Sequence, residues 1–264
     1  DRGVFNKNKN VIPVTIKGLL PGEPKRPEWM KVKANLGSEY IELKNLITEK
    51  KLNTVCEEAS CPNIYECWSM GTATFMIMGD TCTRACGFCD VNTGKPGDLD
   101  ELEPIRVAES VKTMNLTHAV VTSVNRDDLD DGGSGFFAKT IEEIKLMNPS
   151  TSVEVLIPDF KGDRRAIDNI INEAPEVLNH NLETVPRLQR EIRTAASYGR
   201  SLSLLQYAKE VNFSGKTKTG LIVGMGEEFD EVIAVLKDLS QIDIDIVTIG
   251  QYLRPTSKHR PIHR

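Results

Sequence analysis

The six cysteines of this 264-residue chain all lie between Cys56 and Cys89 and form two sets of three. The second set has the spacing C-x3-C-x2-C and consists of Cys82, Cys86 and Cys89. Thiolates at such short spacings are typical ligands of iron–sulfur clusters. Three cysteines leave one iron of a 4Fe-4S cluster open to bind a substrate or cofactor. The first set has the spacing C-x4-C-x5-C and predicts a second three-cysteine site on Cys56, Cys61 and Cys67.

Structural zinc and disulfide bonds are the two alternatives for clustered cysteines. Structural zinc sites usually close with four Cys or His ligands, and neither set has a histidine close to it along the chain. Disulfides are typical of small secreted domains, whereas this chain is long enough to form a core without them. The spacings therefore favour iron–sulfur chemistry, and metal and sulfide analysis of the protein would separate it from zinc binding.

The second set, with Phe88 directly before its last cysteine, resembles the signature of the radical S-adenosylmethionine (SAM) superfamily. The segment from Thr54 to Trp68, continued from Gly71 to Ile77, resembles the lipoyl synthase family, and this similarity covers nearly the whole chain. In that family the first set of cysteines holds an auxiliary cluster, and the second set holds the cluster that cleaves SAM. The resemblance therefore implies two 4Fe-4S clusters and SAM as cofactors.

The activity that the resemblance implies is sulfur insertion at C6 and C8 of a protein-bound octanoyl-lysine. SAM cleavage would give a 5′-deoxyadenosyl radical that abstracts hydrogen from these carbons, and the auxiliary cluster would donate the sulfur. The implied partners are octanoylated lipoyl-carrier domains, either H protein or 2-oxoacid dehydrogenase E2, and an electron donor such as flavodoxin or ferredoxin. The alternatives are another sulfur-inserting enzyme similar to biotin synthase, which would lack the first cysteine set, and a non-enzymatic zinc-binding protein.

Polar side chains follow several predicted strands, and the reactive residues of (β/α) barrels gather at those positions. SAM has an amino acid end, a ribose and an adenine, so its site needs hydroxyl, amide and charged groups. The segment from Thr122 to Gly133 also resembles the family pattern, although an acidic turn would have a similar composition. We expect SAM to contact Phe88, Thr122, Ser123, Asn125, Arg126, Glu154, Asn181, Glu183 and Gly224.

Two of these expectations, those for Glu154 and Gly224, carry a structural alternative. Glu154 lies inside a predicted strand, where a buried carboxylate without a partner is costly, so it either faces solvent or binds a group inside the barrel, and we expect the inward position. Gly224 belongs to a Gly-x-Ile-x-Gly loop that could bring backbone close to the adenine or could be a tight turn. Arg126 is expected to be an exposed loop side chain. His180, at the end of another strand, could be a ligand or a core histidine.

The pattern from Thr72 onward predicts alternating strands and helices, which form βαβ units with a parallel sheet. The predicted strands are Thr74–Met78, His118–Ser123, Ser152–Ile157, Val177–His180, Thr219–Val223 and Asp245–Gly250. The predicted helices are Ile105–Met114, Phe136–Met147, Arg164–Glu173, Pro186–Ser197, Arg200–Val211 and Glu228–Leu239. Six such units indicate an α/β fold, a partial (β/α)6 barrel of the radical SAM type over residues 72–264. Residues 1–71 would form an N-terminal extension that carries the first cysteine set, with a helix near 36–52.

Composition limits the class of protein. A hydrophobic content of 39% and a charged content of 27% are ordinary for a globular protein, and the apolar runs are too short to span a membrane. A net charge of −5 argues against a nucleic-acid-binding protein. The basic residues from Arg254 to Arg264 could be a solvated tail or a surface for an acidic partner. We expect a monomer in the cytoplasm, or in an organelle stroma or matrix if the source is eukaryotic.

The fourth ligand of the auxiliary cluster is the one family feature that the sequence does not supply. Lipoyl synthases resemble one another in a C-terminal Arg-Ser-Ser-Tyr segment whose first serine provides that ligand. The last residues of this sequence are Pro261-Ile262-His263-Arg264. Neither Ser257 nor His259 lies in the matching motif, so the role is transferred to neither. About twenty further residues are expected beyond Arg264 on the family pattern.

Overall fold

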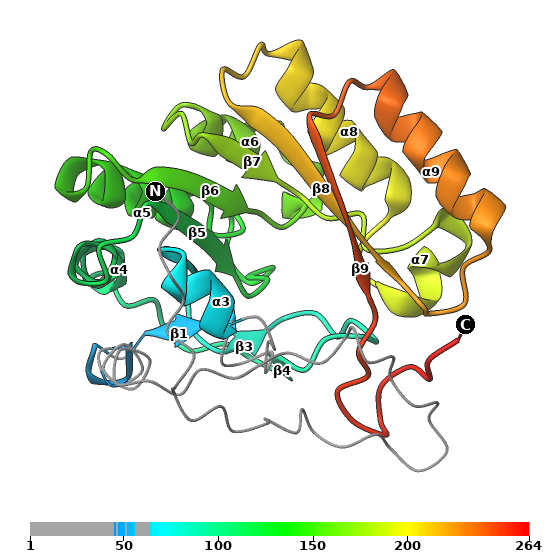
Figure 1. The fold of residues 1–264 in the computed structure, drawn as a ribbon, viewed down its shortest axis with the longest axis horizontal. Coiled ribbons are helices and arrows are strands. Elements are labelled where there is room, and N and C mark those ends of the chain that lie inside the picture. Colours follow the sequence, from blue (N-terminus) through cyan, green and yellow to red (C-terminus); the bar gives the residue numbers. More distant parts are fainter. Residues whose placement is uncertain (1–44, 46, 51, 56–63, 264) are drawn as a thin grey trace, which may run out of the picture.

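The computed structural model describes residues 45, 47–50, 52–55 and 64–263, and the fold is that of an open, curved sheet covered by helices on one side (Figure 1). The predicted helix at 36–52 lies mostly outside the described residues, although residues 45 and 47–49 are helical. The N-terminal extension likewise lies mostly outside them. Two short elements of it are described: strand β1 (Asn53–Thr54) and helix α3 (Ile64–Ser69).

The main sheet has seven strands in the order β1-β2-β5-β6-β7-β8-β9 and is not closed. All neighbouring pairs are parallel except β1 and β2, which are antiparallel. The six parallel strands are β2 (Thr72–Ile77), β5 (His118–Ser123), β6 (Ser152–Leu156), β7 (Val177–Asn179), β8 (Lys216–Val223) and β9 (Ile246–Gln251). These strands are the six that the sequence predicts, with ends that differ by a few residues, and the partial barrel is confirmed.

The helices that connect the strands lie along the outer side of the curved sheet (Figure 1). They are α4 (Glu103–Thr113), α5 (Ser134–Met147), α6 (Arg164–Ile171), α7 (Pro186–Ile192), α8 (Tyr198–Glu210) and α9 (Phe229–Gln241). Helix α7 is shorter than the predicted Pro186–Ser197. It ends at Ile192, and Ser197 instead caps the next helix by accepting a hydrogen bond from the backbone N–H of Arg200 at 3.3 Å.

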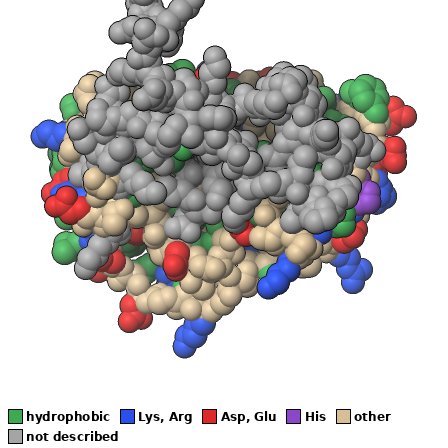
Figure 2. Space-filling view, turned by 60° about the horizontal axis from the view of Figure 1, so that its bottom comes forward, with side chains coloured by type: hydrophobic (Ala, Val, Ile, Leu, Met, Phe, Trp, Pro, Cys, Tyr) green, Lys and Arg blue, Asp and Glu red, His purple; other side chains and the backbone are tan. Residues whose placement is uncertain are grey.

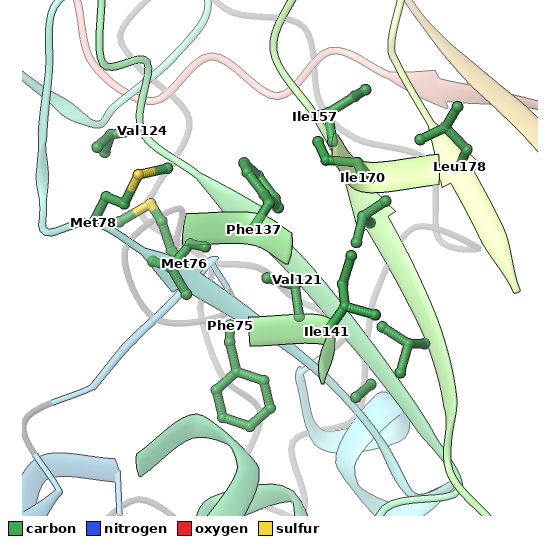
Figure 3. Close-up of a cluster of buried hydrophobic side chains, with 14 of the residues drawn as sticks. Phe75, Met76, Met78, Val121, Val124, Phe137, Ile141, Ile157, Ile170 and Leu178 are labelled. Atoms are coloured by element: carbon green, nitrogen blue, oxygen red, sulfur yellow. The ribbon is translucent and has the colours of Figure 1, made fainter. Parts of the chain in front are cut away.

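The core lies between the sheet and these helices. Phe75, Val121 and Val155 are partners across β2, β5 and β6, and each is fully buried. Figure 3 shows Phe137 and Ile141 close to this part of the sheet. The Phe137 ring also makes an edge-to-face contact with Phe160, with centroids 6.4 Å apart. Because neighbouring residues of a strand point to opposite faces, Thr122 and Leu156 point to the other, inner face of the sheet.

The described surface carries charges of both signs. Figure 2 shows Lys and Arg side chains interspersed with Asp and Glu side chains around the visible described part of one face. Within the described ranges, none of the helices combines the length and the apolar character needed to cross a membrane.

Helix α5 should be held to the sheet mainly by Phe137. Replacing Phe137 with Ala removes a fully buried ring and leaves a cavity, so the free energy of unfolding should fall by about 3–5 kcal/mol. Denaturant unfolding measures this loss. Leu146→Ala on the same helix is the control, because Leu146 is 78% exposed and its loss should change stability by less than about 0.5 kcal/mol. Equal effects of the two substitutions would contradict this account of the core.

Candidate active site

A cavity of about 430 Å³ opens at the carboxyl ends of the parallel strands. Its wall includes Thr122 from β5, Leu156 from β6 and Ile222 from β8, so the inner face of the sheet forms one side of it. Most of the residues predicted to form the site line this cavity. They are Cys82, Cys86, Phe88, Cys89, Thr122, Ser123, Asn125, Asn181 and Glu183.

The second cysteine set lies on one loop whose ends are held by a small sheet. Strand β3 (Thr81–Cys82) pairs in parallel with β4 (Asn92–Thr93), and Cys82 is opposite Thr93. The backbone N–H groups of Arg84 and Asn125 donate to Cys82 Sγ at 3.4 and 3.3 Å. These two hydrogen bonds fix the orientation of the Cys82 side chain.

The other half of the loop is held by the end of helix α7 and by the C-terminal segment. The Gly87 N–H donates to the Ile192 carbonyl at 2.8 Å, and the Gly87 carbonyl accepts from the Arg260 N–H at 3.1 Å. The His259 Nε2 group lies 3.0 Å from the Cys89 carbonyl, which can only accept a hydrogen bond. The backbone that carries Cys86 and Cys89 is therefore fixed at three points.

The three thiols of the loop all line the cavity. In a 4Fe-4S cluster each thiolate binds a different iron, so three thiols on one loop fit such a cluster. Burial raises the pKa of Cys86 to about 11 and also raises the pKa of Cys89. Binding of metal would therefore release their protons.

The first cysteine set is only partly described. Cys56 and Cys61 lie outside the described residues. Cys67 is half-buried on α3, and its helix is anchored by the buried side chains of Ile64 and Trp68. The second three-cysteine site thus stays a prediction.

Two buried polar atoms at the cavity wall fit a polar ligand. Ser123 Oγ and Asn125 Oδ1 have no hydrogen-bond partner among the described residues. Buried polar atoms without partners are rare in native structures. By contrast, the Thr122 hydroxyl is already used, because it donates to the Leu156 carbonyl at 2.9 Å. A ligand with polar groups at this wall would satisfy both unpaired atoms.

Asn181 and Glu183 follow β7 and face the cavity together with Arg193. Gly220 leaves room for the Asn181 side chain, because a Cβ at Gly220 would lie 2.7 Å from Asn181 Oδ1. Burial raises the pKa of Glu183, while the charge of Arg193 and a hydrogen bond from Asn181 oppose that shift. Arg193 also donates to the Leu182 carbonyl at 3.1 Å. The cavity therefore contains a cation beside a carboxylate.

His180 lines the cavity with both ring nitrogens satisfied. Nδ1 lies 2.8 Å from the Ile157 carbonyl, so it must carry the proton, and Nε2 accepts from the Ser201 hydroxyl at 2.8 Å. Burial and the nearby charge of Arg193 lower the pKa of His180 to about 4. The imidazole is therefore neutral at neutral pH. This arrangement favours the core-histidine alternative.

Arg126 is not among the described residues that line the cavity, and it is buried. Its side chain is 3% exposed and donates to the carbonyls of Met78 (3.3 Å) and Gly97 (3.1 Å) and to the Asp128 carboxylate. The expectation of an exposed side chain is wrong, because the loop after β5 folds back over the residues that follow β2. Contact between Arg126 and SAM remains a prediction that this position does not support.

Glu154 lies on the same face of β6 as Leu156 but deeper in the barrel, and it is not among the described residues that line the cavity. Its carboxylate accepts from Lys218 Nζ at 2.8 and 3.0 Å and from Asn179 Nδ2 at 3.1 Å. His118 Nε2 lies 3.4 Å away. Burial would raise the pKa of Glu154, but these partners lower it. The carboxylate is thus already satisfied by protein groups.

Gly224 is also outside the described cavity wall. Its φ of +104° suits glycine, and a Cβ would collide with the Gln251 side chain. The Glu227 carboxylate accepts hydrogen bonds from the N–H groups of Gly224 and Met225, the latter at 2.9 Å. The backbone donors of this turn are therefore occupied by Glu227, which supports the tight-turn alternative.

Four charged residues of the cavity wall were missed by the sequence analysis: Arg84, Asp90, Asp159 and Arg193. Arg84 and Asp90 lie beside predicted cluster ligands in the sequence, and Asp159 follows β6 closely. These positions in the sequence could have identified the three residues as candidates for the site. Arg193 comes after the unexpectedly early end of α7, and the sequence offers no comparable signal for it.

Arg126→Ala should lower stability, because it leaves the buried Met78 carbonyl and the Gly97 carbonyl without this donor. We expect the free energy of unfolding to fall by about 1–3 kcal/mol, measured by denaturant titration. Arg165→Ala is the matched control: the Arg165 side chain is 89% exposed and pairs with its near neighbour Asp163, so little change should follow. An unchanged midpoint for Arg126→Ala would show that these hydrogen bonds contribute nothing.

His180 should make stability depend on pH. Its pKa in the folded protein, about 4, lies below the unfolded value of 6.5, so the unfolded state binds more protons between these values. Stability is therefore complete above pH 6.5 and falls as the pH drops towards 4, by up to about 1.4 kcal/mol per pH unit. Denaturant unfolding at pH 7.5 and 5.5 measures this, and His180→Gln should lose that part of the slope. A variant that keeps the wild-type slope would assign it to other groups.

Comparison with known proteins agrees with this site. Residues 76–239 match the family model described as the Radical SAM superfamily, and residues 17–61 match the N-terminal domain of lipoyl synthase of the Radical_SAM family. Two solved structures share the fold at low sequence identity. Methylornithine synthase (PylB) has a TM-score of 0.54 at 14% identity, covering 83% of this chain and 61% of its own. Streptococcus suis SuiB bound to SAM has a TM-score of 0.58 at 13% identity, covering 86% and 54%.

Two curated relatives are similar in sequence to this chain over most of their own length. Lipoyl synthase of Christiangramia forsetii is 53% identical over 255 residues, which cover 97% of this chain and 86% of the relative. Mitochondrial lipoyl synthase of Nematostella vectensis is 54% identical over 249 residues, which cover 94% and 85%. With the loop of three thiols at the mouth of a partial barrel, this similarity shows that the chain belongs to the lipoyl synthase family of radical SAM enzymes.

Proposed function

We propose that this protein inserts two sulfur atoms, at C6 and C8, into an octanoyl-lysine of a carrier protein, using SAM and two 4Fe-4S clusters. The observation that carries the proposal is the shared cavity. The three thiols of Cys82, Cys86 and Cys89 and the two unpaired atoms of Ser123 and Asn125 face the same space. The thiols would bind three irons of a cluster, and the two polar atoms offer hydrogen bonds to a cofactor bound in the same cavity.

The cavity wall offers separate groups for the parts of SAM. The Asn125 amide and the Ser123 hydroxyl suit the amino acid end, and Arg193 can neutralise a carboxylate. The Glu183 carboxylate can accept hydrogen bonds from hydroxyl groups, and the Asn181 amide can both donate hydrogen bonds to them and accept hydrogen bonds from them. When bound, the cluster and SAM supply radical chemistry on unactivated carbon that no side chain performs. The contribution of the chain is to bind, orient and shield.

The remaining wall is apolar and suits a fatty acyl chain. Val55, Phe88, Leu156, Ile222 and Tyr252 all face the cavity. Burying each methylene of an acyl chain against such a surface is favourable by about 0.8 kcal/mol. The same side chains exclude water from the reacting carbons. A protein-bound octanoyl group can thus enter beside the polar wall.

The sulfur-donating site is proposed on Cys56, Cys61 and Cys67. The match of residues 17–61 to the lipoyl synthase N-terminal domain supports this assignment, and Cys67 lies on α3, whose neighbours in the chain lead directly into β2. As partners we propose H protein or the 2-oxoacid dehydrogenase E2 domain as acyl carrier, and flavodoxin or ferredoxin as reductant. We further propose a monomer located in the cytoplasm or in an organelle matrix.

The two cysteine sets should separate in function. Cys86→Ala removes a ligand of the SAM-cleaving cluster and should stop deoxyadenosine formation. Cys61→Ala should leave deoxyadenosine formation intact but abolish the lipoyl product. Anaerobic turnover with SAM and an octanoylated peptide, followed by mass spectrometry, measures both products.

Two results would refute these assignments. Lipoyl product from Cys61→Ala would show that the first set is not the sulfur donor. A colourless wild-type protein that holds stoichiometric zinc and no acid-labile sulfide after anaerobic reconstitution would refute iron–sulfur chemistry altogether.

A further inference from the structure

Arg84 occupies an unusual position for a buried charge. It lies within the loop of the second cysteine set, two residues after Cys82 and two before Cys86, and it is only 8% exposed. Its guanidinium forms a fork with Asp127, donating from Nε at 2.6 Å and from Nη2 at 2.7 Å. Nη2 also donates to Asp159 Oδ1 at 2.8 Å. Paired bonds of this kind fix geometry as well as charge.

The two carboxylates come from different parts of the barrel. Asp127 belongs to the loop after β5, and Asp159 follows β6. Asp159 has a fully buried side chain and accepts two further hydrogen bonds: Arg200 Nη1 donates to its Oδ2 at 2.9 Å, and the Lys161 N–H donates to its Oδ1 at 3.1 Å. Burial would raise the pKa of Asp159, but Arg84 and Arg200 lower it to about 2. The pair is therefore ionised at neutral pH.

The backbone of Arg84 contacts the sulfur of a predicted ligand. The Arg84 N–H donates to Cys82 Sγ, and the Arg84 carbonyl accepts from the Thr93 hydroxyl at 3.3 Å. The neighbouring Thr83 hydroxyl donates to the Asn125 carbonyl at 2.9 Å. Movement of the Arg84 side chain would thus move the peptide that is bonded to Cys82. The ion pairs and the thiol are parts of one connected unit.

Stability alone does not account for this arrangement. A buried ion pair contributes little net stability, because removing both charges from water costs about as much as their attraction returns. Such pairs are best attested where they fix one geometry among several. Groups that orient the ligands of a metal site commonly matter for metal binding without touching the metal.

We propose that Arg84 is a positioning residue, which through Asp127 and Asp159 holds the segment from Cys82 to Cys86 against the ends of β5 and β6, so that the three thiols accept the cluster in one fixed arrangement. This inference rests on the proposed function, since it takes the three thiols as cluster ligands. Arg84 itself does not enter the reaction.

The test compares Arg84→Lys with Arg165→Lys, the same substitution at an exposed pair on α6. The proteins are reconstituted anaerobically. Iron release to a chelator is then followed over time, and the EPR spectrum of the reduced protein is recorded with and without SAM. Lysine keeps the charge but cannot form the fork. We expect Arg84→Lys to release the iron of the cluster on Cys82, Cys86 and Cys89 about tenfold faster than the wild type does. We also expect it to lose most of the EPR signal that responds to SAM. Arg165→Lys should match the wild type.

Asp127→Asn keeps the inference testable should Arg84→Lys fail to fold. The Asp127 side chain is 25% exposed, so its neutralisation is tolerable, and it weakens the same fork. Faster iron release from folded Asp127→Asn supports the proposal. Wild-type release and an unchanged SAM-responsive signal in either folded variant would overturn it. A wild-type protein that takes up no iron–sulfur cluster would overturn the proposed function and this inference together.

Discussion

The site depends on one geometric constraint: the six parallel strands all end at the same edge of the sheet. Each of these strands (β2, β5, β6, β7, β8 and β9) therefore brings the residues that follow it to one region. The thiol loop follows β2, the unpaired atoms of Ser123 and Asn125 lie at the end of β5, and Glu183 follows β7. None of these segments is close to another along the chain. Parallel pairing of the strands brings them within one cavity of about 430 Å³.

The electrostatics of the interior divide the polar groups into two kinds. The charged ones are paired within the protein: Glu154 with Lys218, and Arg84 with Asp127 and Asp159. Such pairing is required, because a buried charge without a partner is costly. At the described cavity wall, the neutral groups of Ser123 and Asn125 are the ones left unsatisfied. These two neutral groups can therefore bind a cofactor without first breaking a bond within the protein, whereas the paired charges of Arg84, Asp127 and Asp159 hold the loops in place.

The sequence predicted the strands well, but it did not predict the surroundings of Arg126 or the partner of Glu154. Strands such as β5 are short runs of β-branched residues, and that signal is local. The position of Arg126 is not a local property. It depends on carbonyls at Met78 and Gly97, which become neighbours only when the loops after β2 and β5 meet. A carboxylate inside a predicted strand showed that Glu154 needed a partner. That partner is Lys218, which is 64 positions away in the sequence. Proximity in the sequence cannot identify such a partner.

The open sheet is what leaves room for the cavity. A closed barrel of eight strands fills its interior with side chains. Six parallel strands that do not close leave room for a cavity against the inner face of β5, β6 and β8 at their carboxyl ends. Deeper in the barrel, the ion pair of Glu154 and Lys218 occupies the interior beneath this cavity. The thiol loop lies at the opposite end, where the strands finish. The three thiols and the unpaired atoms of Ser123 and Asn125 therefore line one cavity at the carboxyl ends, above this ion pair.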